Sequence, residues 1–234
     1  MCITEKHIRR CMLKGSNRLM LITNRTPRYT EYDQAKMFYE AGGTWVQLRM
    51  KDNLNLETAT EIARLRLPDP HCVLCIDDNV DIALKSGAQS VHLGKNDMPV
   101  REAWSKIKEY QADGYWVGAT ANTFEDIEHA ISEHASYIGL GPYRYTDTKK
   151  NLSPILGLEG YRRVMTQCKE AGYQIPVVAI GGICLEDVVP LLETGVTGIA
   201  VSGAIVNAAD PMEETRKFLA EIKKVYGNEF NEEY

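Results

Sequence analysis

The segment Leu192-Glu-Thr-Gly-Val-Thr-Gly-Ile-Ala-Val201 indicates the fold, because its order of features recurs along the chain. A helical stretch ends, a glycine follows, and a short apolar run begins. Residues 39–48 and 84–93 repeat this order, and residues 131–140 repeat it more loosely. Glycine suits the left-handed conformation that ends a helix, because it has no Cβ atom to clash. The glycines concerned are Gly42, Gly87 and Gly195. This repetition predicts parallel strands joined by helical crossovers.

Short apolar or β-branched runs alternate with longer amphipathic stretches along the chain. The predicted strands are residues 18–23, 45–49, 72–76, 90–93, 115–118, 137–140, 176–180 and 198–201. The predicted helices are residues 32–41, 56–65, 79–85, 101–110, 124–133, 157–171, 185–194 and 211–226.

This alternation without a Pro/Ser-rich linker predicts an α/β fold, a single (β/α)8 TIM barrel over residues 18–226. Residues 1–17 then form an N-terminal extension, and residues 227–234 form a C-terminal tail. A doubly wound open sheet is the alternative. It is disfavoured because the first strand runs into Asn24-Arg-Thr-Pro-Arg28, which lacks the glycines of a dinucleotide-binding turn.

The composition is that of an ordinary globular chain of 234 residues, 44% hydrophobic and 25% charged, with a formal net charge of −5. This mildly acidic balance argues against a nucleic-acid partner. No apolar stretch approaches the roughly 20 residues of a membrane helix. We therefore expect a cytoplasmic protein whose partners are small molecules, with neither nucleic acid nor membrane among them. The sequence leaves the oligomeric state open, a homo-oligomer included.

Cys72 and Cys75 match the C-x-x-C spacing of zinc and redox sites. They lie in a predicted strand, however, where residues three apart point to opposite faces. We therefore expect reduced structural cysteines.

Polar side chains follow the second predicted strand, at the end where a TIM barrel carries its active site. Gln47, Arg49 and Lys51 alternate with apolar residues, so at a period of two they are expected to share one face. The alternative is a solvated strand end. Two cations and an amide in one place favour a site for an anion.

Carboxylates follow the next two strands. Asp77 and Asp78 end the third, and Asp97 follows the fourth. Such oxygen ligands could share Mg²⁺, which often takes its remaining ligands from phosphate and water. The alternative for Asp78 and Asp97 is the capping of helix N-termini.

Later loops add candidates for substrate hydrogen bonds and for binding a second anion. Thr120 and Asn122 follow the fifth strand and could bond a substrate. A long polar loop after the sixth strand carries Thr146, Thr148 and Lys149, and long loops in compact domains commonly cover a site. Gly182, Ser202 and Gly203 follow strands seven and eight, where barrels bind phosphate through backbone N–H groups, although tight turns also favour glycine. One barrel mouth with two anion sites is equipped for a group transfer in which pyrophosphate leaves.

Eight segments in series resemble the thiamine phosphate synthase family in order and spacing. They are VQLRMK (46–51), IDDNVD (76–81), VHLGKNDMP (91–99), GLGP (139–142), TDTKK (146–150), LGLEG (156–160), VAIGGI (178–183) and GIAVSG (198–203). The resemblance implies a Mg²⁺-dependent transferase that condenses 4-amino-2-methyl-5-hydroxymethylpyrimidine diphosphate with a thiazole phosphate, giving thiamine phosphate and pyrophosphate.

The resemblance also assigns roles to residues. It implies that Asp78 and Asp97 hold Mg²⁺. The positions implied to bind the pyrimidine diphosphate are Gln47, Arg49, Lys51, Asp77, Thr120 and Lys149. Among these, Arg49, Lys51 and Lys149 would stabilise the departing pyrophosphate. The positions implied to bind the thiazole phosphate are Thr146, Thr148, Gly182, Ser202 and Gly203.

Three residues depart from the family pattern: Asp77 replaces an Asn, Thr120 a Ser, and Tyr145 a Pro. An ionised Asp77 cannot donate to phosphate, so it either joins the metal or weakens diphosphate binding. The related thiazole tautomerase is disfavoured, because it uses a His where this chain has Asn122. A non-catalytic barrel that binds thiamine precursors is the other alternative. His92 is typical of a satisfied core histidine, and we assign it no role.

Overall fold

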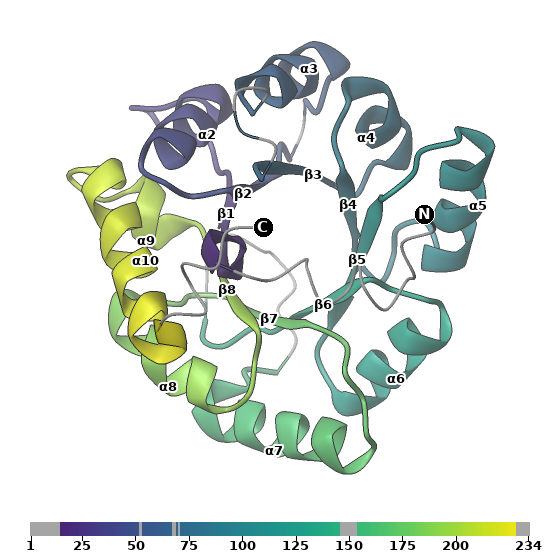
Figure 1. Ribbon diagram of the computed structural model, residues 1–234, viewed down its shortest axis with the longest axis vertical. Coiled ribbons are helices and arrows are strands. Elements are labelled where there is room, and N and C mark those ends of the chain that lie inside the picture. The colour runs from purple at the N-terminus through teal and green to yellow at the C-terminus, as the bar shows by residue number, and fades with distance from the viewer. Residues whose placement is uncertain (1–14, 52, 67–68, 70, 146–153, 228–234) are drawn as a thin grey trace.

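The computed structural model describes residues 15–51, 53–66, 69, 71–145 and 154–227. Within them a closed barrel of parallel strands is surrounded by helices (Figure 1). The strands are β1 Leu19–Ile22, β2 Trp45–Leu48, β3 Val73–Asp77, β4 Ser90–Leu93, β5 Trp116–Ala121, β6 Tyr137–Leu140, β7 Val177–Ile180 and β8 Gly198–Val201. β1 pairs with both β2 and β8, which closes the ring. The predicted TIM barrel and its eight strands are confirmed.

The helices follow the predicted order. They are α2 Glu31–Glu40, α3 Leu56–Leu65, α4 Val80–Ser86, α5 Val100–Glu109, α6 Phe124–Ser132, α7 Gly157–Glu170, α8 Val188–Glu193, α9 Gly203–Val206 and α10 Pro211–Tyr226. The helix predicted over 185–194 divides into a 3₁₀ turn, η2 Leu185–Asp187, and α8. Gly42, Gly87 and Gly195 all have positive φ, as the recurring pattern predicts. No helix in this part of the chain is long and apolar enough to cross a membrane.

The apolar core has two layers. The larger lies between the strands and the surrounding helices. The smaller fills the barrel and includes Met20, Trp45, Cys75 and Tyr137, each no more than 1% exposed. The Trp45 and Tyr137 rings pack edge to face at 4.9 Å. Because this inner layer fills the barrel below the carboxyl ends of the strands, the open space lies at those ends.

A 3₁₀ turn, η1 Gly15–Arg18, leads into β1 and contacts β2, β8 and α10. The Asn17 side chain accepts a hydrogen bond from the Thr44 hydroxyl at 2.6 Å. The Arg18 guanidinium lies 3.5 Å from the centre of the Tyr226 ring. The residues just before β1 are thus packed against the barrel, while residues 1–14 lie outside the described part.

Candidate functional site

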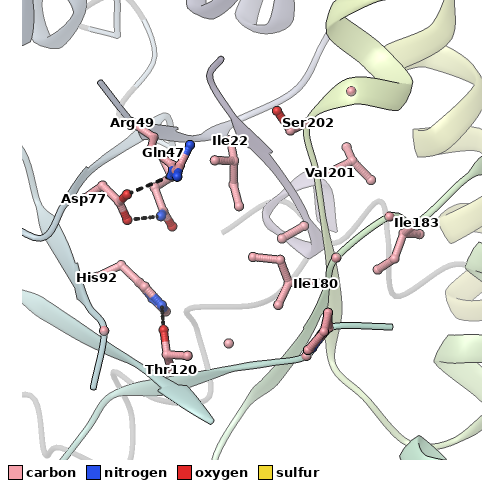
Figure 2. A pocket seen from close by; sticks show the side chains of 18 of the residues that line it. Ile22, Gln47, Arg49, Asp77, His92, Thr120, Ile180, Ile183, Val201 and Ser202 are labelled. Atoms are coloured by element: carbon pink, nitrogen blue, oxygen red, sulfur yellow. Dashed lines mark hydrogen bonds and ion pairs between the residues drawn. The ribbon is translucent and has the colours of Figure 1, made fainter. Parts of the chain in front are cut away.

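A cavity of about 450 Å³ opens at the carboxyl ends of the strands. Its walls come from all eight strands or the segments that follow them (Figure 2). It collects ten candidate residues from the sequence, namely Gln47, Arg49, Asp77, Asp78, Asp97, Thr120, Asn122, Gly182, Ser202 and Gly203. Thr146, Thr148 and Lys149 lie outside the described residues.

Asp77 lies beside Gln47 and Arg49 at one side of the cavity, with its carboxylate directed at both (Figure 2). One carboxylate oxygen accepts a hydrogen bond from Gln47 Nε2 at 2.5 Å. The other lies 3.3 Å from Arg49 Nε, and the Arg49 and Asp77 side chains are only 23% and 13% exposed. Asp77 thus compensates the Arg49 charge and orients Gln47, a role that its position in the sequence does not reveal.

The position of Lys51 differs from the expectation that it shares one strand face with Gln47 and Arg49. β2 ends at Leu48, and Lys51 lies in the turn beyond it, so the alternation on one strand face does not reach Lys51. The residue instead lines a neighbouring cavity of about 330 Å³, whose wall also includes Arg49, Asp77 and Asp78. Lys51 therefore lies next to Arg49 and Asp77 in a turn rather than on the strand.

Asp78 and Asp97 bring two carboxyl groups together at the mouth. Asp78 has φ +64°, and its backbone N–H donates to the His92 carbonyl at 2.8 Å. Asp97 accepts a hydrogen bond from the Gly94 N–H at 2.7 Å. Partial burial, the Asp77 charge and a hydrogen bond with Asp97 raise the pKa of the Asp78 carboxyl to about 7. Adjacent carboxyl oxygens with excess negative charge are a donor set that suits a hard divalent cation.

Helix capping does not account for these two carboxylates. The cap of α4 is Asn79, whose side-chain oxygen accepts from the Ile82 N–H at 2.9 Å. The N-cap position of α5 is Pro99, which provides no side-chain hydrogen bond. Neither Asp78 nor Asp97 is therefore needed to begin a helix.

His92 and Thr120 form part of the cavity floor. His92 is 6% exposed, with Nε2 3.0 Å from the Thr120 hydroxyl and Nδ1 3.2 Å from the Tyr137 hydroxyl (Figure 2). The expectation of a satisfied, buried histidine is confirmed. The Asn122 side-chain amide donates to the Gly141 carbonyl, which ties the end of β5 to the end of β6.

The opposite side of the cavity is formed by the ends of β7 and β8. Gly181 and Gly182 have φ values of +102° and +67°. A Cβ atom on Gly182 would lie 2.5 Å from the Arg144 Cγ, so this turn has no room for a side chain. The Ser202 Oγ is buried and has no hydrogen-bond partner among the described residues. Gly203 follows it and begins α9. This hydroxyl, beside backbone N–H groups, suits a small anion.

Sequence reasoning missed the contacts that hold the Gly182 turn. Arg144 donates to the Gly182 carbonyl at 3.2 Å and to Asp187 at 2.7 Å. The Tyr143 hydroxyl donates to the same Asp187 oxygen at 3.1 Å. Asp187 lies 43 residues from Arg144 in sequence, so no local motif signals this pair.

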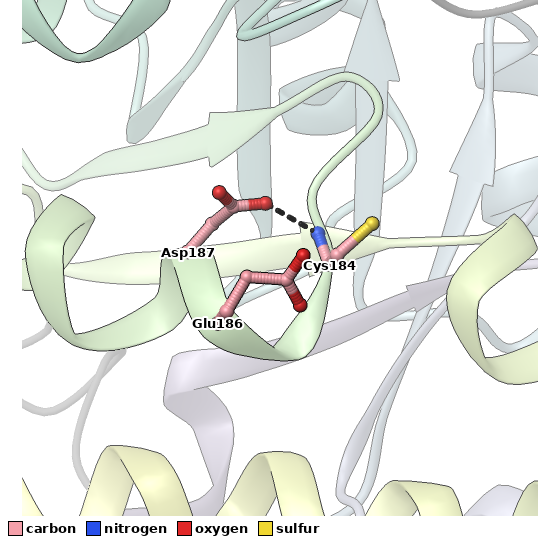
Figure 3. A group of neighbouring side chains, drawn as sticks. All are labelled: Cys184, Glu186 and Asp187. Carbon is pink, nitrogen blue, oxygen red and sulfur yellow. Dashed lines mark hydrogen bonds between the residues drawn. The ribbon is translucent and has the colours of Figure 1, made fainter.

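The Asp187 carboxylate also lies near Cys184 and Glu186, with one potential ligand atom of each residue within 4.8 Å of the others (Figure 3). Its other oxygen accepts from the Cys184 N–H at 2.8 Å. With both oxygens of Asp187 hydrogen-bonded, we interpret this group as a cap of η2 that also fixes the β7 loop.

The predicted burial of Cys72 and Cys75 is confirmed. Cys72 and Cys75 are buried and form no disulfide. Burial raises the pKa of both thiols to about 12. A raised thiol pKa disfavours the thiolate that metal binding and redox chemistry require.

Comparisons with known proteins agree with this geometry. Residues 19–205 match a family model described as thiamine monophosphate synthase. The thiamine-phosphate synthase of Bacteroides thetaiotaomicron is 47% identical over 203 residues, 86% of this chain and 95% of the relative. That of Phocaeicola vulgatus is 48% identical over 204 residues, 86% of this chain and 96% of the relative. The solved structure of thiamine phosphate pyrophosphorylase from Pyrococcus furiosus has a TM-score of 0.77 and 31% identity, covering 91% of this chain and 98% of its own.

Proposed function

The chain belongs to the thiamine monophosphate synthase family and is a transferase with thiamine-phosphate synthase activity, and we propose that its cavity joins 4-amino-2-methyl-5-hydroxymethylpyrimidine diphosphate to a thiazole phosphate. The bond between the pyrimidine methylene carbon and the diphosphate oxygen breaks, and pyrophosphate leaves with the electron pair. A bond forms between that carbon and the thiazole nitrogen. The products are thiamine phosphate and pyrophosphate.

The pyrimidine diphosphate binds on the side of the cavity formed by β2 and β3. Gln47 is 3% exposed and held by Asp77, so its amide is oriented before substrate arrives. Arg49 supplies a cation at the same place, and Lys51 supplies another from the adjoining turn. A fixed positive charge beside the leaving group stabilises the negative charge that develops there. We assign Lys149 to the same role from the family resemblance.

Asp78 and Asp97 would hold Mg²⁺. Their neighbouring carboxyl groups are a suitable donor set, and the pKa of Asp78 is raised first by burial and then by the nearby Asp77 and Asp97 carboxyl groups. When bound, Mg²⁺ supplies Lewis-acid stabilisation to phosphate oxygens. Ionised Asp78 and Asp97 are the protein's contribution to that site. Asp77 remains committed to Gln47 and Arg49.

The thiazole phosphate binds at the ends of β7 and β8. The Ser202 hydroxyl, buried and without a partner among the described residues, is available to donate to a phosphate oxygen. Gly182 and Gly203 allow the ligand to approach the backbone closely, since neither carries a Cβ atom. Thr146 and Thr148 are assigned here from the family resemblance alone.

The observation that carries this proposal is the position of the Asp78 and Asp97 carboxyl groups in one cavity with Arg49 and the Ser202 turn. The test measures pyrophosphate release from both substrates as Mg²⁺ is varied, for wild type, Asp78→Asn and Asp97→Asn. Asp81→Asn is the matched control, because Asp81 is exposed in the first turn of α4 and pairs with Lys106 at 2.8 Å.

We expect Asp78→Asn and Asp97→Asn to lose Mg²⁺-dependent turnover and Asp81→Asn to keep it. Unchanged turnover and metal dependence in both site variants would contradict the assignment.

We also propose that the reaction takes place in the cytoplasm. Four described cysteines, Cys72, Cys75, Cys168 and Cys184, are free thiols, which suits a reducing compartment.

A further inference from the structure

His92 and Tyr137 form a buried pair of rings beneath the cavity. His92 on β4 lies in register with Gly118 on β5, and Gly118 lies in register with Tyr137 on β6. His92, Gly118 and Tyr137 therefore lie side by side on three neighbouring strands, with the glycine between the two ring-bearing residues. The Tyr137 hydroxyl reaches His92 Nδ1 at 3.2 Å, and the ring centres are 5.6 Å apart.

Two glycines make room for this pair. A Cβ atom on Gly118 would lie 2.2 Å from the Tyr137 Cζ and 2.6 Å from the His92 Nδ1. A Cβ atom on Gly139 would lie 2.9 Å from the His92 Cε1. Real Cβ atoms do not approach other atoms this closely, so side chains at either position would displace the imidazole. Glycine within a strand often marks such a close approach.

The direction of the hydrogen bonds follows from the strengths of the acceptors. The Tyr137 hydroxyl has one hydrogen to donate, and its neighbours are His92 Nδ1 at 3.2 Å, Cys75 Sγ at 3.6 Å and the Ser90 hydroxyl. An unprotonated imidazole nitrogen is a better acceptor than a neutral hydroxyl oxygen and a far better one than a thiol sulfur. Burial raises the pKa of the Tyr137 phenol, so the proton stays in place to be donated. The Tyr137 hydroxyl therefore donates its hydrogen bond to Nδ1.

Because Nδ1 of His92 accepts a hydrogen bond, the role of the other ring nitrogen is also determined. With Nδ1 accepting, neutral His92 carries its proton on Nε2, the nitrogen 3.0 Å from the Thr120 oxygen. The Thr120 oxygen accepts a hydrogen bond from this N–H, so its own hydroxyl hydrogen remains to be donated elsewhere. Thr120 lines the cavity, so this hydrogen is available to a ligand there.

We propose that His92 and Tyr137 are positioning residues, which make the Thr120 hydroxyl a hydrogen-bond donor to an acceptor nitrogen of the pyrimidine ring. This inference rests on the proposed function, because it names how one of the two substrates is recognised. A ring that presents a donor or a C–H group to Thr120 would be bound less well, so the arrangement contributes to substrate specificity.

The test is a double-mutant cycle on the Michaelis constant for the pyrimidine diphosphate. Thr120→Val removes the hydroxyl at nearly constant volume, and Tyr137→Phe removes only the phenolic oxygen. One neutral hydrogen bond predicts that each single change raises this KM about 3- to 10-fold. The KM for the thiazole phosphate should not change, and Thr120→Ser should retain the wild-type KM for the pyrimidine diphosphate.

If Tyr137 acts through Thr120, Tyr137→Phe has no further effect in the Thr120→Val protein. If the KM of the double variant instead rises by the product of the two single effects, the proposal is overturned. Tyr137 would then have a merely structural role that is independent of Thr120. Thermal unfolding of each variant identifies a general loss of stability.

A second measurement does not depend on mutation or turnover. Nitrogen-15 NMR of histidine-labelled wild-type protein should show a neutral His92 with the proton on Nε2, and an Nδ1–H tautomer would overturn the proposal. Absence of thiamine phosphate formation by the wild-type enzyme would instead contradict the proposed substrates, and the NMR result would still stand as a separate test.

Discussion

Replacing Gly182 with alanine tests whether the β7 turn is shaped for phosphate. Gly182 has φ +67°, and an added Cβ would lie 2.5 Å from the Arg144 Cγ and 2.9 Å from the Tyr145 carbonyl oxygen. The Arg144 side chain could rotate away, but the carbonyl belongs to the backbone. We therefore expect Gly182→Ala to separate the turn from the loop that follows β6.

Two causes contribute to the loss of stability in Gly182→Ala, namely backbone strain and the displacement of neighbouring atoms. A non-glycine residue in the left-handed region costs about 1–2 kcal/mol, which lowers the melting temperature of a chain of this size by about 2–8 °C. Gly87→Ala is the matched control, since Gly87 has φ +82° and nothing lies within 4 Å of an added Cβ. Both variants should lose this stability, and Gly182→Ala should lose more.

Substrate affinity separates the two variants further. A hydrogen bond to a charged group contributes about 1.5–3 kcal/mol, so loss of one backbone donor to the phosphate raises KM about 10- to 150-fold. Steady-state kinetics should show this rise for the thiazole phosphate in Gly182→Ala only, with the KM for the pyrimidine diphosphate unchanged. Equal KM values for the thiazole phosphate in the two variants would refute the assignment of this turn to phosphate.

Two further predictions concern the other anion site. Asp77→Asn should keep turnover and lower the KM for the pyrimidine diphosphate about two- to fivefold, because a partly exposed ion pair of up to ~1 kcal/mol no longer competes for Arg49; steady-state kinetics would contradict this by showing a large loss of turnover. The raised pKa of Asp78, about 7, predicts that its ionised fraction falls about tenfold from pH 8 to pH 6. Because protons compete with the metal, calorimetry should show Mg²⁺ affinity falling by a similar factor, and an affinity that is constant over this range would contradict the role of Asp78.

The barrel was predictable because its signal is local and repeated. Each helix end, glycine and apolar strand lies within about ten residues, and the positive φ values of Gly42, Gly87 and Gly195 confirm why glycine recurs there. The carboxyl ends of parallel strands meet at one end of a barrel, so residues far apart in sequence could be assigned to a common mouth. Most of the predicted site residues that the structure describes do line one cavity.

The parts that were not predictable depend on exact strand ends or on distant partners. Lys51 was assigned to a strand face, but β2 ends three residues earlier. The sequence left open whether Asp77 joins the metal or weakens diphosphate binding, because its partner Gln47 lies 30 residues away. The choice between Asp78 and Asn79 as the cap of α4 is decided by the positive φ of Asp78, which hydrophobic periodicity does not reveal.

The most direct test of the account is a single turnover by the full-length enzyme, freed of metal, mixed with both substrates and then supplied with Mg²⁺. The account predicts thiamine phosphate and pyrophosphate in equal amounts, formed only after Mg²⁺ is added. Product formed at the same rate without Mg²⁺, or pyrophosphate released without thiamine phosphate, would contradict it.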